Sequence, residues 1–315
     1  MSSPKVAESP SVEEAARVLA QGGLVAFPTE TVYGLGARAD DDGAVAGIFQ
    51  AKGRPSDHPL IVHVLDVEGA RAFARELPPM ALRLMDAVWP GPVTVIVPRR
   101  SGVGSACAGG QDSIGLRCPS HPVARALLER ALALGVPGVA APSANRFGRV
   151  SPTKAEHVRT EFGGTVPVLE GGACEAGIES AIVDCTRGEP VLLRPGTVDR
   201  RALERAAGMP LRERDAQAPR ASGTLESHYA PAAKVRLLDS RDWADALHSR
   251  LEHRSADASG SALALYSSVG PAGASGAGLH WRRMPPTPGA VAHELFGVLR
   301  ELDAWLGQQG GGEIW

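Results

Sequence analysis

The chain has 315 residues, of which 43% are hydrophobic and 22% charged, so it is a globular protein that can bury a sizeable core. Its formal net charge of −2 provides no overall field toward nucleic acid or anionic lipid, and any RNA contact would be weak and limited to a local basic patch. The four cysteines lack Cys-x-x-Cys spacing, so neither a zinc site nor a disulfide framework is expected. The sequence shows no signal-peptide pattern and no apolar run long enough to span a bilayer. We therefore expect a cytoplasmic protein with no membrane partner.

The first elements along the chain are a helix, a buried strand and a polar turn. Ser11 and Glu14 form a capping-box pattern that predicts a helix to about Ala20. The apolar run 24–27 predicts a short buried strand, which leads into the turn Pro28-Thr29-Glu30-Thr31. Hydroxyl and carboxylate groups at the exit of a buried strand are typical of a ligand crevice, although threonines can also simply close their own turn.

Alternating helix and strand patterns continue through the first two thirds of the chain. A second capping-box pattern, Thr153 with Glu156, predicts another helix start. The other expected helices span 42–51, 67–76, 78–88, 122–134 and 198–207, and the expected strands span 59–64, 94–97, 114–118, 138–141, 166–169, 181–185 and 191–194. This alternation predicts a mixed α/β domain over residues 1–210.

A change of composition follows this domain. Residues 211–231 are polar, charged and rich in Ala and Pro, as in a linker. Residues 232–315 contain strand-like runs at 235–238 and 262–266, together with helical patterns near 240–252 and 288–306. A second, small α/β domain is therefore expected at 232–315.

Polar and cationic residues gather at the predicted ends of strands and helices. Lys52 and Arg54 share a loop with Gly and Pro, and a lysine at such a place is notable in a chain with 29 arginines and four lysines. A lysine as a point charge and an arginine as a fork suit adjacent phosphates. Arg117 could hold a carboxylate bidentately, and Ser143-Ala144-Asn145 offers donors to a phosphate or a ribose.

Each of these residues also has a plain structural interpretation. Lys52 and Arg54 could be a solvated helix C-terminus, His63 a core histidine and Arg117 part of a structural ion pair. Together they favour a ligand site, because most of them adjoin Gly or Pro at strand ends. No P-loop pattern is present, and the G-x-G-x-x-A run at 34–39 is separated from its strand by the polar turn, so it is rejected as a dinucleotide site.

Three long motifs carry a resemblance to a known family. The segments 27–36 (FPTETVYGLG), 51–63 (AKGRPSDHPLIVH) and 142–145 (PSAN) resemble the signature of the YrdC/Sua5 family of L-threonylcarbamoyladenylate synthases. The resemblance covers about 12–210 and resumes at 222–231, which is similar to the linker of the two-domain Sua5 form. It implies a YrdC-like twisted mixed sheet flanked by helices, plus a small Rossmann-like α/β C-terminal domain.

The resemblance also implies an activity, that of a nucleotidyltransferase. L-threonine and bicarbonate or CO2 would form N-carbamoylthreonine, whose carboxylate attacks the α-phosphate of ATP and expels pyrophosphate. Mg²⁺ would accompany ATP, with no protein side chain assigned as its ligand. The product would serve the t6A37 modification of tRNA through a downstream tRNA threonylcarbamoyltransferase machinery. Such chemistry needs positioning and cations rather than a protein nucleophile, which agrees with the residues at the strand ends.

Matching the family motifs residue by residue gives the expected site. The residues that act in catalysis would be Lys52 and Arg54. The residues of the L-threonine pocket would be Thr31, His63, Arg117, the backbone at Ala141, and Ser180. The residues that bind ATP would be Lys52, Arg54, His58, Ser113, Ser143, Asn145, Ser151, Arg194 and, from the linker, Tyr229. The alternative hypothesis is a double-stranded RNA-binding or ribosome-associated factor whose concave basic surface is formed by Lys52, Arg54, Arg117, Arg146, Arg149 and Arg194.

Overall fold

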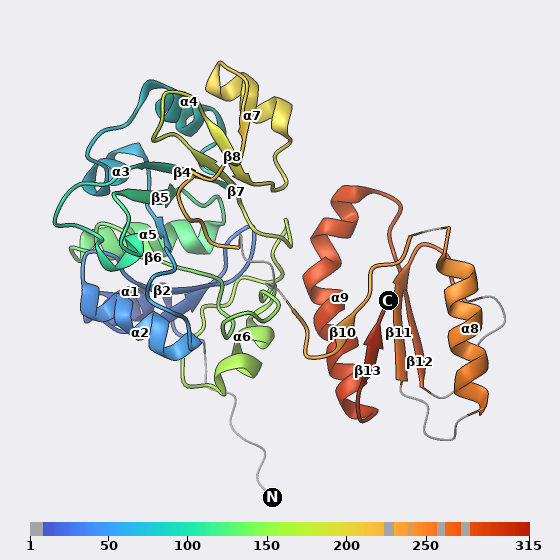
Figure 1. Cartoon of the computed structure of the whole chain (residues 1–315). Coiled ribbons are helices and arrows are strands. Elements are labelled where there is room, and N and C mark those ends of the chain that lie inside the picture. Colours follow the sequence, from blue (N-terminus) through green and yellow to red (C-terminus); the bar gives the residue numbers. More distant parts are fainter. Residues whose placement is uncertain (1–8, 224–229, 240, 257–261, 272–277) are drawn as a thin grey trace, which may run out of the picture. The chain divides into compact units, whose positions relative to one another are not determined.

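The computed structural model shows two compact units (Figure 1). The first comprises Met1–Phe147 and Ser151–His228, and the second comprises Gly148–Val150 and Tyr229–Trp315. The structure describes residues 9–223, 230–239, 241–256, 262–271 and 278–315.

The first unit is built on a mixed sheet of nine strands in its described part. The strands are β1 (Val25–Phe27), β2 (Gly34–Arg38), β3 (Ile61–His63), β4 (Val93–Pro98), β5 (Ser113–Arg117), β6 (Val139–Ala140), β7 (Ala181–Asp184), β8 (Val191–Arg194) and β9 (Arg212–Glu213). Their order is β1-β2-β6-β3-β5-β4-β7-β8-β9. β3 runs parallel to β5, while β4 is antiparallel to β5 and parallel to β7. The predicted mixed sheet is confirmed.

Helices flank this sheet, as the sequence predicted. They are α1 (Val12–Ala20), α2 (Asp42–Lys52), α3 (Val67–Phe73), α4 (Pro79–Val88), α5 (Pro122–Ala133), α6 (Ala155–Phe162) and α7 (Arg200–Ala207), with a short 3-10 turn at Ala106–Ala108. The capping box of α1 is confirmed, because the Ser11 hydroxyl accepts from the Glu14 N–H at 3.2 Å and the Glu14 carboxylate accepts from the Ser11 N–H at 2.8 Å. Among the described residues, no helix is long and apolar enough to cross a membrane.

Strand β2 is the main element that the sequence did not predict in this unit. It pairs antiparallel with β1, with Val25 opposite Gly36 and Phe27 opposite Gly34. A Cβ atom on Gly36 would lie 2.8 Å from both the Phe27 ring and a methyl group of Val139. The glycines therefore make room for apolar packing across the hairpin. They also hide the strand from a pattern-based prediction, because glycine is depleted in strands.

Two local predictions are wrong. The Thr153–Glu156 capping box does not form, because the helix starts one residue later, at Ala155 with Lys154 as N-cap. That start places His157 rather than Glu156 at the third helical position, and the His157 Nδ1 accepts from the Thr153 N–H at 3.2 Å. The strand expected at 166–169 is reduced to an isolated bridge between Val168 and Ala26, where Pro167 has no N–H to donate to a ladder.

The second unit has a four-stranded parallel sheet in its described part. Its strands are β10 (Lys234–Val235), β11 (Ala262–Ser267), β12 (Leu279–Arg283) and β13 (Gly312–Ile314), in the order β10-β13-β11-β12. The helices α8 (Trp243–Ala256) and α9 (Pro288–Gln308) lie on opposite faces (Figure 1). Ala264 of β11 belongs to the same apolar cluster as Leu302 of α9, and Leu263 to the cluster of Leu247 of α8. This doubly covered parallel sheet is the Rossmann-like arrangement that was predicted.

The sequence did not predict β12 and β13, and it placed the first strand of this unit too far along the chain. β12 reads Leu-His-Trp-Arg-Arg and is mostly exposed, so its pattern gives no apolar run. β13 follows two glycines with positive φ, Gly310 and Gly311, and is three residues long. β10 ends at Val235, and Leu237, which lay within the predicted strand, is fully exposed.

Candidate functional site

The first group of predicted site residues surrounds Arg117, at the end of β5. The parallel register of β3 and β5 places His63 directly beside Arg117. The Arg117 Nη1 donates to the Thr31 hydroxyl at 2.8 Å, and the Nε donates to the Gly91 carbonyl at 3.4 Å. The Nη2 lies 2.7 Å from the Glu30 Oε1, an ion-pair contact without the alignment of a hydrogen bond. We call Glu30, Thr31, His63 and Arg117 the Arg117 cluster.

The turn after β1 positions the Thr31 hydroxyl toward Arg117. The Thr29 hydroxyl donates to the Val32 carbonyl at 2.6 Å and accepts from the Val32 N–H at 3.2 Å. It also lies 2.8 Å from the Thr31 hydroxyl. Thr29 thus closes its own turn, while Thr31 contacts Arg117. The sequence left two roles open for these threonines. Thr29 closes its own turn, and Thr31 faces another predicted site residue.

His63 is buried and neutral. Burial and the neighbouring Arg117 cation lower the pKa of His63 to about 3. Its ring packs edge-on against Phe27, with 6.0 Å between the ring centroids. Among the described residues, its Nδ1 has no hydrogen-bond partner. A neutral imidazole of this kind can exchange hydrogen bonds with a ligand but adds no charge to the Arg117 cluster.

Two further residues of the expected threonine pocket have other contacts. The Ala141 N–H donates to the Ile61 carbonyl at 2.9 Å, which extends the pairing of β6 with β3. The Ser180 hydroxyl lies 2.9 Å from the Thr94 hydroxyl and accepts from the Arg194 Nη2 at 3.2 Å. Ser180 is therefore joined to a residue that was predicted on the nucleotide side.

The second group of site residues contains three buried cations, Lys52, Arg54 and Arg194, which we call the cation cluster. Lys52 ends α2, and Gly53 stops the helix with a φ of 62°. The Lys52 Nζ donates to the carbonyls of Ser143, at 2.5 Å, and Asn145. Burial, with a smaller contribution from the nearby Arg54 charge, lowers the pKa of Lys52 to about 7. The lysine therefore joins the loop after α2 to the Ser143–Asn145 segment.

The side chains of Arg54 and His58 meet at Phe147. The Arg54 guanidinium lies 5.7 Å from the centre of the Phe147 ring, and the His58 ring is 5.3 Å from it in an edge-on arrangement. The Arg54 Nη2 donates to the Pro59 carbonyl at 3.0 Å and to the Ser222 hydroxyl at 3.4 Å. Burial, followed by the charge of Arg54, lowers the pKa of His58. This loop thus holds a cation against an aromatic face.

Arg194 ends β8 and contacts both Glu179 and the linker. Its Nη1 donates to the Ser222 carbonyl at 2.8 Å, and its Nη2 lies 3.8 Å from the Glu179 Oε2. The other oxygen of Glu179 accepts from the Ser151 hydroxyl at 2.7 Å. Ser151 and Arg194 are therefore brought together by Glu179, a residue that the sequence analysis missed.

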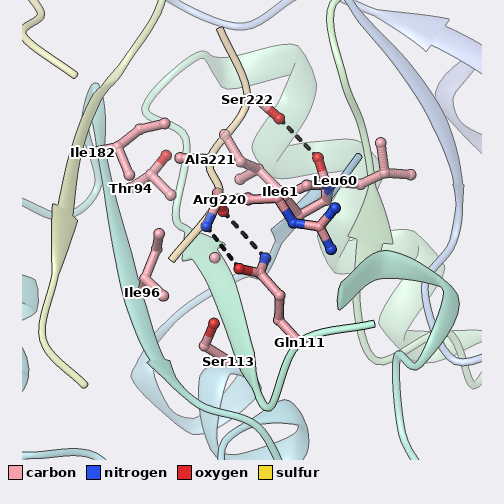
Figure 2. Close-up of a pocket in the computed structure, with 12 residues that line it drawn as sticks. Leu60, Ile61, Thr94, Ile96, Gln111, Ser113, Ile182, Arg220, Ala221 and Ser222 are labelled. Carbon is pink, nitrogen blue, oxygen red and sulfur yellow. Dashed lines mark hydrogen bonds between the residues drawn. The ribbon is translucent and has the colours of Figure 1, made fainter. Parts of the chain in front are cut away.

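A pocket lies against the sheet (Figure 2), and two of its lining residues, Pro59 and Ser222, accept hydrogen bonds from Arg54. Thr94, Ile96, Ser113 and Ile182 line it from the sheet, and the linker residues 220–222 lie across it. Figure 2 shows how Gln111 fixes this segment: its Oε1 accepts from the Arg220 N–H at 2.7 Å and its Nε2 donates to the Arg220 carbonyl at 3.1 Å. Ser113 is the one predicted nucleotide-side residue among the pocket's lining residues.

The sequence missed several residues that organise the site. The Glu30 carboxylate was noted in the polar turn but was not placed among the site residues, and Ser222 stands at the start of the linker motif, so both had a signal in the sequence. Gln111 and Glu179 lie outside the quoted motifs, so no pattern in the sequence marked them as site residues. Tyr229, predicted to reach the site from the linker, lies outside the described residues.

The fold and the site together define a class of protein. An α/β sheet carries buried Arg and Lys side chains at strand and helix ends, which is an arrangement for binding anionic substrates and for transferring a group by positioning and charge. Two family models match the chain. Sua5_yciO_yrdC, described as "Telomere recombination", matches residues 17–196, and Sua5_C, described as "Threonylcarbamoyl-AMP synthase, C-terminal domain", matches residues 197–311.

Individual relatives agree with these matches. The threonylcarbamoyl-AMP synthase of Pyrococcus abyssi is 41% identical over 231 residues, covering 71% of this chain and 67% of the relative. That of Bacillus subtilis is 39% identical over 237 residues, covering 73% and 67%. The crystal structure of P. abyssi Sua5 complexed with L-threonine has a TM-score of 0.84 at 34% identity, covering 96% of this chain and 87% of that one. The chain belongs to the Sua5/YrdC family in its two-domain form, and it is an enzyme of the nucleotidyltransferase class.

Proposed function

We propose that this enzyme makes L-threonylcarbamoyl-AMP from L-threonine, bicarbonate or CO2, and ATP, with release of pyrophosphate. The observation that carries the proposal is the pairing of two different sites in one unit. The Arg117 cluster offers a buried guanidinium with hydroxyl and imidazole groups, and the cation cluster offers three buried cations. An amino acid matches the first site, and a triphosphate matches the second.

The proposed reaction proceeds by in-line displacement at phosphorus. An oxygen of the carbamate group of N-carboxy-L-threonine, which forms when the L-threonine amine adds to CO2 and loses a proton, forms a bond to the α-phosphorus of ATP, and the bond from that phosphorus to the bridging oxygen of pyrophosphate breaks. The leaving pyrophosphate keeps the electron pair. Lys52 and Arg54 stabilise the negative charge that grows on the phosphoryl oxygens, without forming a covalent intermediate.

The geometry of Lys52 supports this role. Two carbonyl oxygens hold its ammonium group, which has three donor positions, so one N–H remains for a phosphate oxygen. In the same proposal His58, Ser113, Ser143, Asn145, Ser151, Arg194 and Tyr229 bind ATP. Thr31, His63, Arg117, Ala141 and Ser180 bind L-threonine.

Mg²⁺ would be held chiefly by ATP. Among the described residues, no group of three or more His, Cys, Asp or Glu side chains could form a metal site. The carboxylate of Glu179 is engaged by Ser151, and that of Glu30 by Arg117 and the Ser120 N–H. Mg²⁺ bound by phosphate oxygens would neutralise charge on the triphosphate, in the way that nucleotide-dependent enzymes ordinarily use it.

We assign the chemistry to residues 1–210, with 211–231 as linker and 232–315 as the C-terminal domain. The product would pass to a tRNA threonylcarbamoyltransferase machinery for the t6A37 modification. The RNA-binding alternative is less well supported, because Lys52, Arg54, Arg117 and Arg194 are all buried. Cations at the surface, not in a core, are what a phosphate backbone contacts.

The test is pyrophosphate release from ATP by the full chain with Mg²⁺, with and without L-threonine and bicarbonate. Release that depends on both, and is lost in Lys52→Ala, is the expected result. ATP turnover that is indifferent to L-threonine, or no turnover at all, would contradict the proposed function.

A further inference from the structure

Glu30 belongs to the Arg117 cluster, but it has no role in the proposed reaction. Its side chain is 8% exposed, and its Oε1 lies 2.7 Å from the Arg117 Nη2. Its Oε2 accepts from the Ser120 N–H at 3.2 Å, and its backbone carbonyl accepts from the Ala176 N–H at 2.7 Å. The residue is thus fixed from three sides in a position that brings its carboxylate to the guanidinium.

The physical reason for this contact is the charge of Arg117. A guanidinium that is almost fully buried requires a counter-charge, because an isolated ion in a protein interior strongly destabilises the fold. Thr31 and Gly91, its hydrogen-bond acceptors, are neutral. Within the described part of the chain, Glu30 is the carboxylate paired with Arg117.

The pairing is close but imperfect. Glu30 and Arg117 lie at ion-pair distance without an aligned hydrogen bond between the Oε1 and the Nη2. Arginine binds carboxylates best through two parallel hydrogen bonds. A free carboxylate that enters the cluster can therefore form better hydrogen bonds to Arg117 than Glu30 does.

We propose that Glu30 is an internal counter-ion of Arg117 that competes with the carboxylate of the amino acid substrate, and so lowers the affinity of the site for L-threonine. This inference rests on the proposed function. In the empty site Glu30 neutralises Arg117. When the substrate carboxylate binds, it replaces or shares that role. Glu30 is in this view a positioning residue that acts through Arg117.

The proposal makes a distinctive prediction for Glu30→Gln. This change keeps the shape of the side chain and an oxygen that can accept from the Ser120 N–H, but it removes the charge. The empty protein should lose stability, since a buried guanidinium is left without a counter-ion. The substrate carboxylate then supplies the missing charge, so the variant should bind L-threonine more tightly, by on the order of tenfold.

The experiment is calorimetric titration of the full-length protein and its variants with L-threonine and with L-threoninamide, which has no carboxylate. Glu30→Gln should lower the Kd for L-threonine and leave that for L-threoninamide unchanged. L-threonine should also raise the melting temperature of this variant more than that of the wild type. The matched control is Glu170→Gln, which removes an exposed ion pair with Arg159, 2.6 Å long, and should alter neither Kd.

The opposite result overturns the proposal. If folded Glu30→Gln binds L-threonine as the wild type does, or more weakly, Glu30 merely holds Arg117 in place. If Glu30→Gln does not fold, Glu30→Asp is the variant that tests the proposal. Its shorter side chain moves the charge away from Arg117, so it should tighten L-threonine binding by a smaller factor. A wild-type protein that does not bind L-threonine contradicts the proposed function instead, whatever the variants do.

Discussion

The Arg117 cluster and the cation cluster lie in the same unit but balance their charges differently. Arg117 is paired with Glu30 at 2.7 Å, so its cluster is close to neutral. The cation cluster contains Lys52, Arg54 and Arg194, and the Arg194 Nη2 lies 3.8 Å from the carboxylate of Glu179. Lys52 and Arg54 instead donate to carbonyl oxygens.

This difference supports the proposal that one unit binds two unlike substrates. Lys52 donates to two carbonyl dipoles, which do not cancel its charge, so in the proposed reaction that charge can act on a polyphosphate. A neutral cluster attracts polyanions less and favours a small zwitterion that matches its hydrogen bonds. The predictions below test whether the two clusters are separable in this way.

The largest expected effect is on the cation cluster. Lys52→Met should reduce threonine-dependent pyrophosphate release by about 10²- to 10³-fold or more, because a preorganised donor at the reacting phosphate is lost. The measurement is kcat/KM for ATP at saturating L-threonine. The same substitution at the exposed Lys154, whose side chain makes no capping hydrogen bond, is the control and should leave kcat/KM unchanged. Equal losses in both variants would contradict the role of Lys52.

A smaller and more selective effect is expected in the Arg117 cluster. Thr31→Val removes the hydroxyl that accepts from the Arg117 Nη1. It should raise the KM for L-threonine about tenfold, because the hydroxyl that is proposed to bind the substrate and to orient Arg117 is lost, with little change in the KM for ATP. Thr31→Ser, which keeps the hydroxyl, should restore the wild-type KM. If both KM values rise together, the two clusters are not separable.

The lowered pKa of Lys52 predicts proton uptake on ATP binding. With a pKa of about 7, the free enzyme carries a largely neutral Lys52 at pH 8. Bound phosphates favour the charged ammonium and raise this pKa, so binding at pH 8 should take up as much as about one proton, and less at pH 6, where Lys52 is already charged. Calorimetry in two buffers of different ionisation enthalpy measures the uptake. Uptake by Lys52→Met equal to that of the wild type would show that another group is responsible.

The smallest effect should come from the N-cap of α1, which belongs to neither cluster. Ser11→Ala removes the cap of α1 and should lower the free energy of unfolding by about 1 kcal/mol. The KM values for L-threonine and for ATP should both equal those of the wild type. This result would show how a purely structural change affects the kinetics. Urea denaturation and steady-state kinetics on the same preparation check both parts. A changed KM would mean that the clusters respond to general loss of stability.

Much of the fold followed from local pattern. Ser11 and Glu14 lie one helical turn apart, so their pairing could be predicted from spacing alone. Thr153 and Glu156 have the same spacing, yet the tertiary structure starts that helix one residue later. β2 was missed because its glycines are required by the ring of Phe27 on the neighbouring strand, a contact that no local pattern records.

The candidate site also contains residues that local pattern predicted and residues that it did not. The sequence predicted Lys52 and Arg54 as site residues, because a lysine and an arginine next to Gly and Pro stand out within a few residues. It did not identify Ser222 as the group that joins Arg54 to Arg194, because these three residues are far apart along the chain. Glu179 and Gln111 were missed for the same reason.

The sequence by itself determined the α/β class of both units and the family, and it predicted the kinds of chemical group in the proposed site. Only the tertiary structure decided the charge state of each cluster. The pairing of Glu30 with Arg117 and the burial of Lys52 depend on which distant segments the sheet brings together. Charge and pKa respond to neighbours within a few ångströms, whatever their separation in sequence, and this is why the folded chain was needed to distinguish a neutral cluster from a cationic one.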